Sequence, residues 1–173
     1  MFEDEFGLSF SEPVSFTWAP RGQTPVLKRL GKYRREVSTM AALTISGKVY
    51  KRHFAGSINS EKIIVGLEHV RRYVRKPFIL IWDRSRTHRS KRVEQYLLDH
   101  PDIHVEFLPA YAPELNPEEF CHGNVKRRIK NAAFSSTAEI RKSVDGGFAR
   151  LRKRPDLLLG CFHHAGLALN KLW

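Results

Sequence analysis

Hydrophobic and polar positions alternate along the first ten residues of the chain. On an extended backbone, one side would carry two aromatic residues with an acid between them, and the other side two further acids: Phe2, Asp4 and Phe6 on the first, Glu3 and Glu5 on the second. This period of two predicts a β-strand. Asp4 is therefore expected to lie on a strand.

This first strand is followed by a turn-rich segment and then by two strand-like segments. Residues 13–31 contain three prolines and two glycines, which predicts an irregular loop across the surface. Within it, Trp18 is expected to anchor on the core, with stacking on an unpaired base as the alternative. Residues 37–45 and 48–54 are β-rich and flank a Ser-Gly pair at 46–47. This arrangement predicts a hairpin.

Helical and strand periods alternate through the middle of the chain. Asn59 or Ser60 can cap a helix that Pro77 ends, and the continuous apolar run 78–82 predicts a strand covered on both faces. Ser90 can start a second helix, and an alternating strand pattern follows it. The apolar positions are Ile63, Leu67, Val70 and Val74 in the first helix, Val93, Leu97 and Leu98 in the second, and Ile103, Val105 and Phe107 in the strand.

Three more helices are predicted after a proline-punctuated loop at 108–117. Asn116 can cap the first of them, with Pro117 at its first position. The segment Ser136–Glu139 matches a capping box for the second, and the third would follow Pro155. The apolar positions are Ile140, Val144, Phe148 and Leu151 in the second, and Leu158, Phe162, Ala165 and Leu169 in the third.

The length of 173 residues suits one substantial core. We therefore expect a single α/β domain over residues 1–173, with C-terminal helices over 135–173. The 30 Lys and Arg against 18 Asp and Glu give a net charge of +12, which indicates a polyanionic partner. Nucleic acid is the simplest such partner, and an acidic membrane surface is the lesser alternative.

Other compositional features narrow the class of protein. No apolar run approaches the roughly 20 residues that span a bilayer, and the acidic start is unlike a signal peptide. We therefore expect a soluble cytoplasmic protein, associated with the nucleoid through DNA. Cys121 and Cys161 lack the spacing of metal ligands, which argues against a disulfide framework and a structural zinc site.

Three acids stand where a two-metal site could form. Asp4 lies on the first strand, Asp83 directly follows the apolar run, and Glu119 falls in the first turn of a capped helix. Because 78 residues lie between the first two and 35 between the last two, the fold would have to bring them together. Two divalent ions about 3.5–4 Å apart could then assist displacement at a phosphodiester. The alternative is three ordinary surface acids.

Four motifs connect the chain with a known family. They are Asp4-Glu5, Trp18-Ala-Pro-Arg-Gly22, Asp83 with His88 five positions later, and Leu108-Pro-Ala-Tyr-Ala-Pro-Glu-Leu-Asn-Pro-Glu-Glu119. Over nearly its whole length, the chain resembles the insertion-sequence 630 branch of the mariner-superfamily transposases, also catalogued as DDE-superfamily endonucleases. The resemblance implies an RNase H-like fold, with a central mixed β-sheet flanked by α-helices. It also implies a metal-binding triad of Asp4, Asp83 and Glu119 that holds two Mg²⁺ or Mn²⁺ ions.

The chain departs from the family pattern beside two of these acids. Arg84 and Arg86 follow Asp83 where the family commonly has Asn and small residues, and they could contact phosphate or weaken metal binding. His122 stands where a Trp is usual. His88 could orient a phosphate or a carboxylate, with capping or packing as the alternative.

Basic residues continue along the helix that Pro117 starts. Residues at three- and four-residue steps would share one face: Glu119, His122, Lys126 and Lys130. We expect Lys126 and Lys130, with Arg127 and Arg128 nearby, to hold DNA phosphates that lead to the metals. The alternative is a solvated basic helix face.

The leading hypothesis is the catalytic domain of a DNA transposase, which cleaves the ends of its element and joins the freed 3′-hydroxyls to target DNA. The resemblance also implies a homodimer in the active complex. One alternative is a catalytically silent remnant that binds DNA without cutting, and another is a nuclease acting on RNA–DNA hybrids. No helix-turn-helix module precedes the first acid. We therefore expect either fusion by frameshifting to an upstream helix-turn-helix frame or a truncated remnant.

Overall fold

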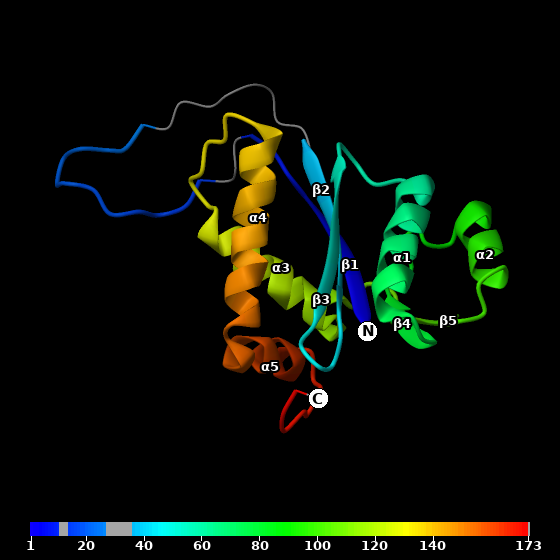
Figure 1. Ribbon diagram of the computed structural model, residues 1–173. Coiled ribbons are helices and arrows are strands. Elements are labelled where there is room, and N and C mark those ends of the chain that lie inside the picture. Colours follow the sequence, from blue (N-terminus) through cyan, green and yellow to red (C-terminus); the bar gives the residue numbers. More distant parts are fainter. Residues whose placement is uncertain (11–13, 27–35, 173) are drawn as a thin grey trace.

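A five-stranded mixed sheet forms the centre of the molecule (Figure 1). The computed structural model describes residues 1–10, 14–26 and 36–172. The strands are β1 (Phe2–Leu8), β2 (Val37–Leu43), β3 (Val49–Ala55), β4 (Phe78–Trp82) and β5 (Ile103–Phe107), in the spatial order β3-β2-β1-β4-β5. The β1-β2 and β2-β3 pairs are antiparallel, whereas β1-β4 and β4-β5 are parallel. The predicted hairpin and all five predicted strands are confirmed.

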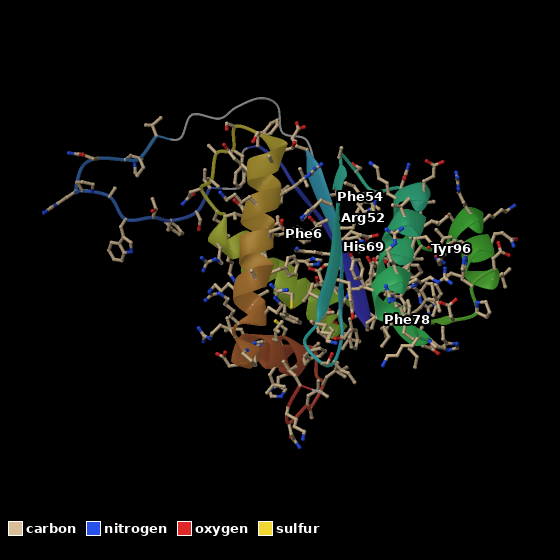
Figure 2. The ribbon with its side chains drawn as sticks, in the orientation of Figure 1. Phe6, Arg52, Phe54, His69, Phe78 and Tyr96 are labelled. Carbon is tan, nitrogen blue, oxygen red and sulfur yellow. The ribbon has the colours of Figure 1, made fainter. Side chains whose placement is uncertain are left out.

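Helices cover both faces of this sheet (Figure 1). The helices are α1 (Ser60–Val74), α2 (Lys91–Leu98), α3 (Pro117–Arg128), α4 (Thr137–Arg152) and α5 (Pro155–His164), with a 3-10 turn at Pro113–Leu115. One core lies between the sheet and α1 and α2, and another between the sheet and α3, α4 and α5. Figure 2 shows Phe6 on the α4 side of the sheet and Tyr96 between α1 and α2. This layered arrangement confirms the expected α/β class.

The alternation along β1 distributes its side chains between the two cores. Phe2 and Phe6 are buried with the α3–α5 core, so Asp4 faces the same side. Glu3 faces the α1–α2 side and is only 1% exposed. A charged residue at this position would be expensive to bury without a partner, so its surroundings need an explanation.

The predicted helix starts are confirmed by their caps. The Asn59 side chain accepts from the Lys62 N–H at 3.0 Å, and the Ser90 hydroxyl accepts from the Val93 N–H at 3.4 Å. Asn116 caps α3 and Ser136 caps α4 in the same way. Such caps satisfy backbone N–H groups that a helix leaves free at its start.

Two details of the predicted burial and one of the predicted helix extents are wrong. Strand β4 is not covered on both faces, because α3 packs on β1 and β2 and leaves Ile79 52% exposed. On α2 the buried positions are Val93 and Tyr96, three residues apart, so Leu98 falls on the outer face and is 76% exposed. Helix α5 ends at His164, so Leu169 lies beyond it.

The segment 14–26 is irregular. Ser15 is hydrogen-bonded to Asn131, and the segment otherwise forms an arm that stands away from the body instead of crossing its surface (Figure 1). Trp18 is 99% exposed, so the predicted anchoring of this side chain on the core is wrong. The rest of the predicted loop, residue 13 and residues 27–31, lies outside the described residues.

Candidate active site

The three predicted acids line one cavity. Its volume is about 710 Å³, and Asp4, Asp83 and Glu119 all contribute to its wall. Asp83 directly follows β4, and Glu119 lies in the first turn of α3, where the Asn116 cap fixes the helix start. The fold therefore brings three distant segments to one place, beside the carboxyl ends of the parallel strands β4 and β5, where ligands of α/β sheets usually bind.

Asp4 and Glu119 form a close pair. An oxygen of each lies within 4.8 Å of the other and of a His122 ring nitrogen. Burial, followed by the charge of Glu119, raises the pKa of Asp4 to about 8. Two carboxylates held this close repel one another when both are ionised. A divalent cation between them would remove this repulsion and favour ionisation.

Asp83 is held separately by hydrogen bonds on its own side of the cavity. One carboxylate oxygen lies 2.7 Å from His88 Nδ1 and accepts from the Ser85 N–H at 2.9 Å. The hydrogen bond from His88 lowers the pKa of Asp83, so this carboxylate stays ionised. The site thus combines a close acid pair with a third, separately oriented carboxylate.

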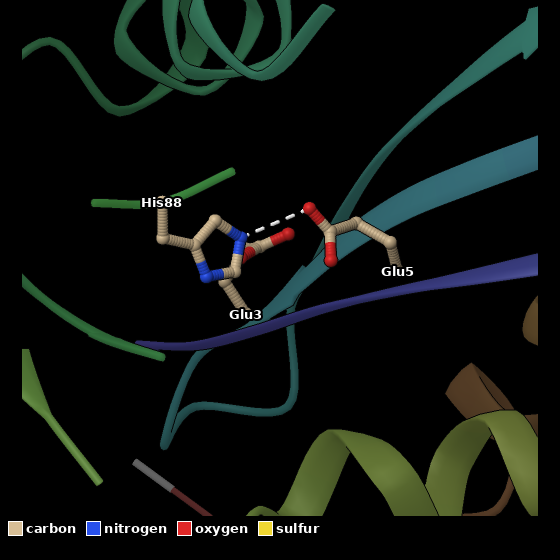
Figure 3. A group of neighbouring side chains, drawn as sticks. All are labelled: Glu3, Glu5 and His88. Atoms are coloured by element: carbon tan, nitrogen blue, oxygen red, sulfur yellow. Dashed lines mark hydrogen bonds and ion pairs between the residues drawn. The ribbon is translucent and has the colours of Figure 1, made fainter. Parts of the chain in front are cut away.

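His88, which contacts Asp83 through Nδ1, also lies beside two acids of β1, Glu3 and Glu5, on the α1–α2 side of the sheet (Figure 3). Its Nε2 lies 2.9 Å from Glu5 Oε1 and 3.7 Å from Glu3 Oε2, and its ring stacks on Trp82. Burial by itself would lower the pKa of His88, but the hydrogen bonds to Asp83 and Glu5 outweigh it and raise the pKa to about 11. His88 is therefore an imidazolium that contacts a carboxylate, one of its predicted roles.

Glu3 and Glu118 are buried acids whose carboxylate oxygens have no hydrogen-bond partner in the described part of the chain. Burial raises the pKa of both well above the usual range, which favours the neutral form of each carboxyl group. His122 is equally buried, and burial lowers its pKa well below the usual range. Sequence reasoning gave no site role to these three residues. For Glu3 and Glu118 the reason is that an acid beside another acid at the start of a strand or helix is usually a surface residue.

The cations around the cavity are not the ones on α3. Arg84 and Arg86 line it together with Arg89, which sequence reasoning missed although it lies in the same turn between β4 and α2. Lys126 instead extends over the Phe6 ring, with Nζ 5.3 Å from the ring centroid. Helix α3 ends at Arg128, so the expectation that Lys130 shares its face is wrong.

The remaining α3 cations, Arg127 and Arg128, are exposed, and none of the four predicted cations on and after α3 is among the residues lining the cavity. Contact of these cations with DNA phosphates remains a prediction. Tyr111 is a further cavity residue that the sequence did not single out. It has a positive φ of 58° and a fully exposed side chain, a strained arrangement that is concentrated at functional sites.

A family model described as DDE superfamily endonuclease matches residues 1–141. The chain belongs to this family. No curated protein sequence matches the chain. The expected membership of the DDE-superfamily endonucleases is therefore confirmed. None of the described helices is long and apolar enough to cross a membrane.

Solved structures of Mos1 transposase share the fold of this DDE endonuclease. The Mos1 strand transfer complex has a TM-score of 0.67 at 18% identity and covers 98% of this chain and 55% of that chain. The catalytic domain of Mos1 mariner transposase has a TM-score of 0.59 at 16% identity and covers 98% of this chain and 83% of that chain. This likeness confirms the expected RNase H-like fold. The chain spans just over half the length of the longer Mos1 chains.

The donor atoms around the cavity fit divalent metal ions. Asp4, Asp83 and Glu119 supply carboxylate oxygens, the ligands that Mg²⁺ and Mn²⁺ prefer. The buried Asp4 carboxyl also needs a positive partner to ionise near pH 7. Mos1 paired end complexes have been solved with Mn and with Mg.

Proposed function

We propose that this DDE endonuclease is the catalytic domain of a DNA transposase that cleaves and joins DNA strands with divalent metal ions. The observation that carries the proposal is the convergence of Asp4, Asp83 and Glu119 on one cavity. Arginines on the same wall and a net charge of +12 suit a DNA substrate. The similarity in fold to Mos1 transposase supports the same conclusion.

The acids and the arginines of the cavity would have different roles. Asp4 and Glu119 would hold one Mg²⁺ or Mn²⁺ ion, and Asp83 would help to hold a second. Bound ions of this kind neutralise charge on attacking and leaving oxygens during in-line displacement. Arg84 and Arg86 would hold the DNA backbone beside the acids. Hydrolysis at an element end and joining of the freed 3′-hydroxyl to target DNA are both phosphoryl transfers, so one site can serve both.

The complete reaction needs recognition of the transposon ends and two copies of the site. We propose that a helix-turn-helix frame, joined by frameshifting, supplies end recognition, and that a homodimer acts on paired ends in the nucleoid. The arm 14–26 supports self-association, because several of its apolar side chains are almost fully exposed. The most exposed of them are Phe16, Trp18 and Val26.

Nicking of supercoiled plasmid DNA tests the proposed activity. We expect Mn²⁺-dependent nicking by the unsubstituted protein. Asp4→Asn or Asp83→Asn should reduce the nicking rate by at least about 100-fold, because even the loss of a residue that only contacts a metal ligand lowers activity by about 10–100-fold. Asp99→Asn, which changes an exposed acid at the end of α2, is the matched control and should nick normally.

The same assay separates the alternatives. Protein that binds the plasmid yet leaves it supercoiled would be a silent remnant, and the proposed activity would be wrong. Cleavage of an RNA–DNA hybrid in preference to duplex DNA would instead favour the hybrid nuclease that this fold also permits.

A further inference from the structure

His122 lies where a third ligand of the Asp4–Glu119 cation would lie. Its Nδ1 is 4.0 Å from Asp4 Oδ2 and 4.0 Å from Glu119 Oε2. The ring is 1% exposed and is held against the Phe6 ring, with the centroids 4.5 Å apart. The imidazole is therefore fixed by the core and cannot turn away into solvent.

These separations suit ligands of one ion. Metal–ligand distances of about 2.0–2.2 Å place neighbouring ligand atoms about 3.0–3.4 Å apart. Each 4.0 Å gap thus needs to close by less than about 1 Å. Glu119 is the more movable partner, because its side chain is 44% exposed whereas those of Asp4 and His122 are 15% and 1% exposed. A cation entering the cavity could draw the Glu119 carboxylate toward Asp4 and Nδ1.

The other side of the ring has the partner that a metal-bound histidine needs. Nε2 lies 3.5 Å from Glu118 Oε1, and both groups are buried with no hydrogen bond in the described residues. Metal-binding histidines usually donate their second N–H to a carboxylate, which fixes the ring and its tautomer. A cation on Nδ1 would place the proton on Nε2, facing Glu118. This gives a role to two buried polar groups that otherwise have none.

We propose that His122 Nδ1 is a ligand, beside Asp4 and Glu119, of a divalent cation, and that Glu118 positions the ring. The inference rests on the proposed function only in taking these two acids as metal ligands. Imidazole nitrogen is a softer donor than carboxylate oxygen and favours transition metals over Mg²⁺. The His122 ligand therefore shifts the preference of this cation site from Mg²⁺ toward Mn²⁺.

Pulsed electron paramagnetic resonance of bound Mn²⁺ tests the nitrogen ligand directly. The unsubstituted protein should show coupling between Mn²⁺ and ¹⁴N, and His122→Phe should abolish it. His122→Gln keeps a polar group near Glu118 but offers no nitrogen at the Nδ1 position, so it should abolish the coupling too. His164→Phe, which removes an exposed imidazole from α5, is the matched control and should retain the signal.

Metal titration gives a second readout. Both His122 variants should bind Mn²⁺ at least about 10-fold more weakly, since even outer-shell partners contribute that much, while Mg²⁺ binding should change less. Bound Mn²⁺ without ¹⁴N coupling in the unsubstituted protein would overturn the proposal. So would coupling that survives in the His122 variants. If Mn²⁺ shows the coupling but plasmid DNA stays uncut, the ligand assignment stands and the nuclease proposal falls.

Discussion

His88 is 1% exposed and contacts carboxylates through both ring nitrogens. Its positive charge is paired with Asp83 on one side and Glu5 on the other, so it can orient Asp83 without leaving an unpaired cation beside the proposed metal site. The stacked Trp82 ring, with its centroid 4.0 Å away, limits rotation of the imidazole. One side chain thus links the α1–α2 core to the wall of the cavity.

We expect the two ring nitrogens of His88 to contribute unequally to metal binding. His88→Gln keeps an amide near Glu5 but no longer reaches Asp83, and it should weaken Mn²⁺ binding by about 10–100-fold. His88→Asn keeps an amide near Asp83 and should weaken it less. Isothermal titration with Mn²⁺ measures both variants.

An Asp83→Asn background provides the control for this prediction. Without the Asp83 carboxylate, His88→Gln should weaken Mn²⁺ binding little further, because the two changes remove one shared interaction. Equal weakening in both backgrounds would mean that His88 acts on the fold as a whole and not through Asp83.

At the scale of elements, the position of α3 decides the geometry of the site, because this helix carries Glu118, Glu119 and His122. Gly147 of α4 faces it, and a Cβ at this glycine would come within 2.9 Å of the Val125 side chain. The close approach of the two helices depends on the absence of a side chain there. Gly146, next in the chain, has open space around the same position.

This adjacent pair of glycines gives a matched test of the packing of α3 on α4. Gly147→Ala should lower the free energy of unfolding by about 1–3 kcal/mol, because the added methyl group overpacks the interface. Gly146→Ala should raise it by about 0.5–1 kcal/mol, because alanine favours the helix and meets no neighbour. Urea denaturation measures both. Similar destabilisation by the two substitutions would show that close packing against Val125 does not determine the change in the free energy of unfolding.

At the scale of the whole molecule, the effect of the 12 excess positive charges on binding of the proposed DNA substrate depends on where those charges lie. Three arginines, Arg84, Arg86 and Arg89, line the cavity with the acids. Another basic group, including Arg72 and Arg75, surrounds a separate pocket beside Pro77, at the opposite end of β4 from Asp83. The two groups therefore carry similar charge at different distances from the candidate catalytic acids.

Salt dependence of DNA binding should distinguish the two groups. Replacing Arg84 and Arg86 by Ala should reduce the slope of log affinity against log salt by roughly 0.9 for each phosphate that the protein then leaves without a cation. The control, Ala at both Arg72 and Arg75, removes the same charge and should leave the slope nearly unchanged. Fluorescence anisotropy across a salt series measures this. Equal reductions in both double variants would mean that net charge alone drives binding.

The sequence alone predicted the secondary-structure elements and singled out the three candidate acids. Helix caps such as Asn116 depend on neighbours two or three residues away, and the alternation along β1 is a local property of the strand, so both can be read without the fold. Asp83 was recognisable because it ends an apolar run, and Glu119 because it follows a cap.

Only the tertiary structure decided which charged groups are buried together. His88 lies 83 residues from Glu5 in the sequence, yet the two are hydrogen-bonded, and His122 meets Asp4 across the boundary between α3 and β1. Such contacts depend on helix packing and strand order, which local sequence patterns do not reveal. The exposure of Trp18 was misjudged for the same reason, because an aromatic residue in a loop packs or projects according to what the rest of the fold places beneath it.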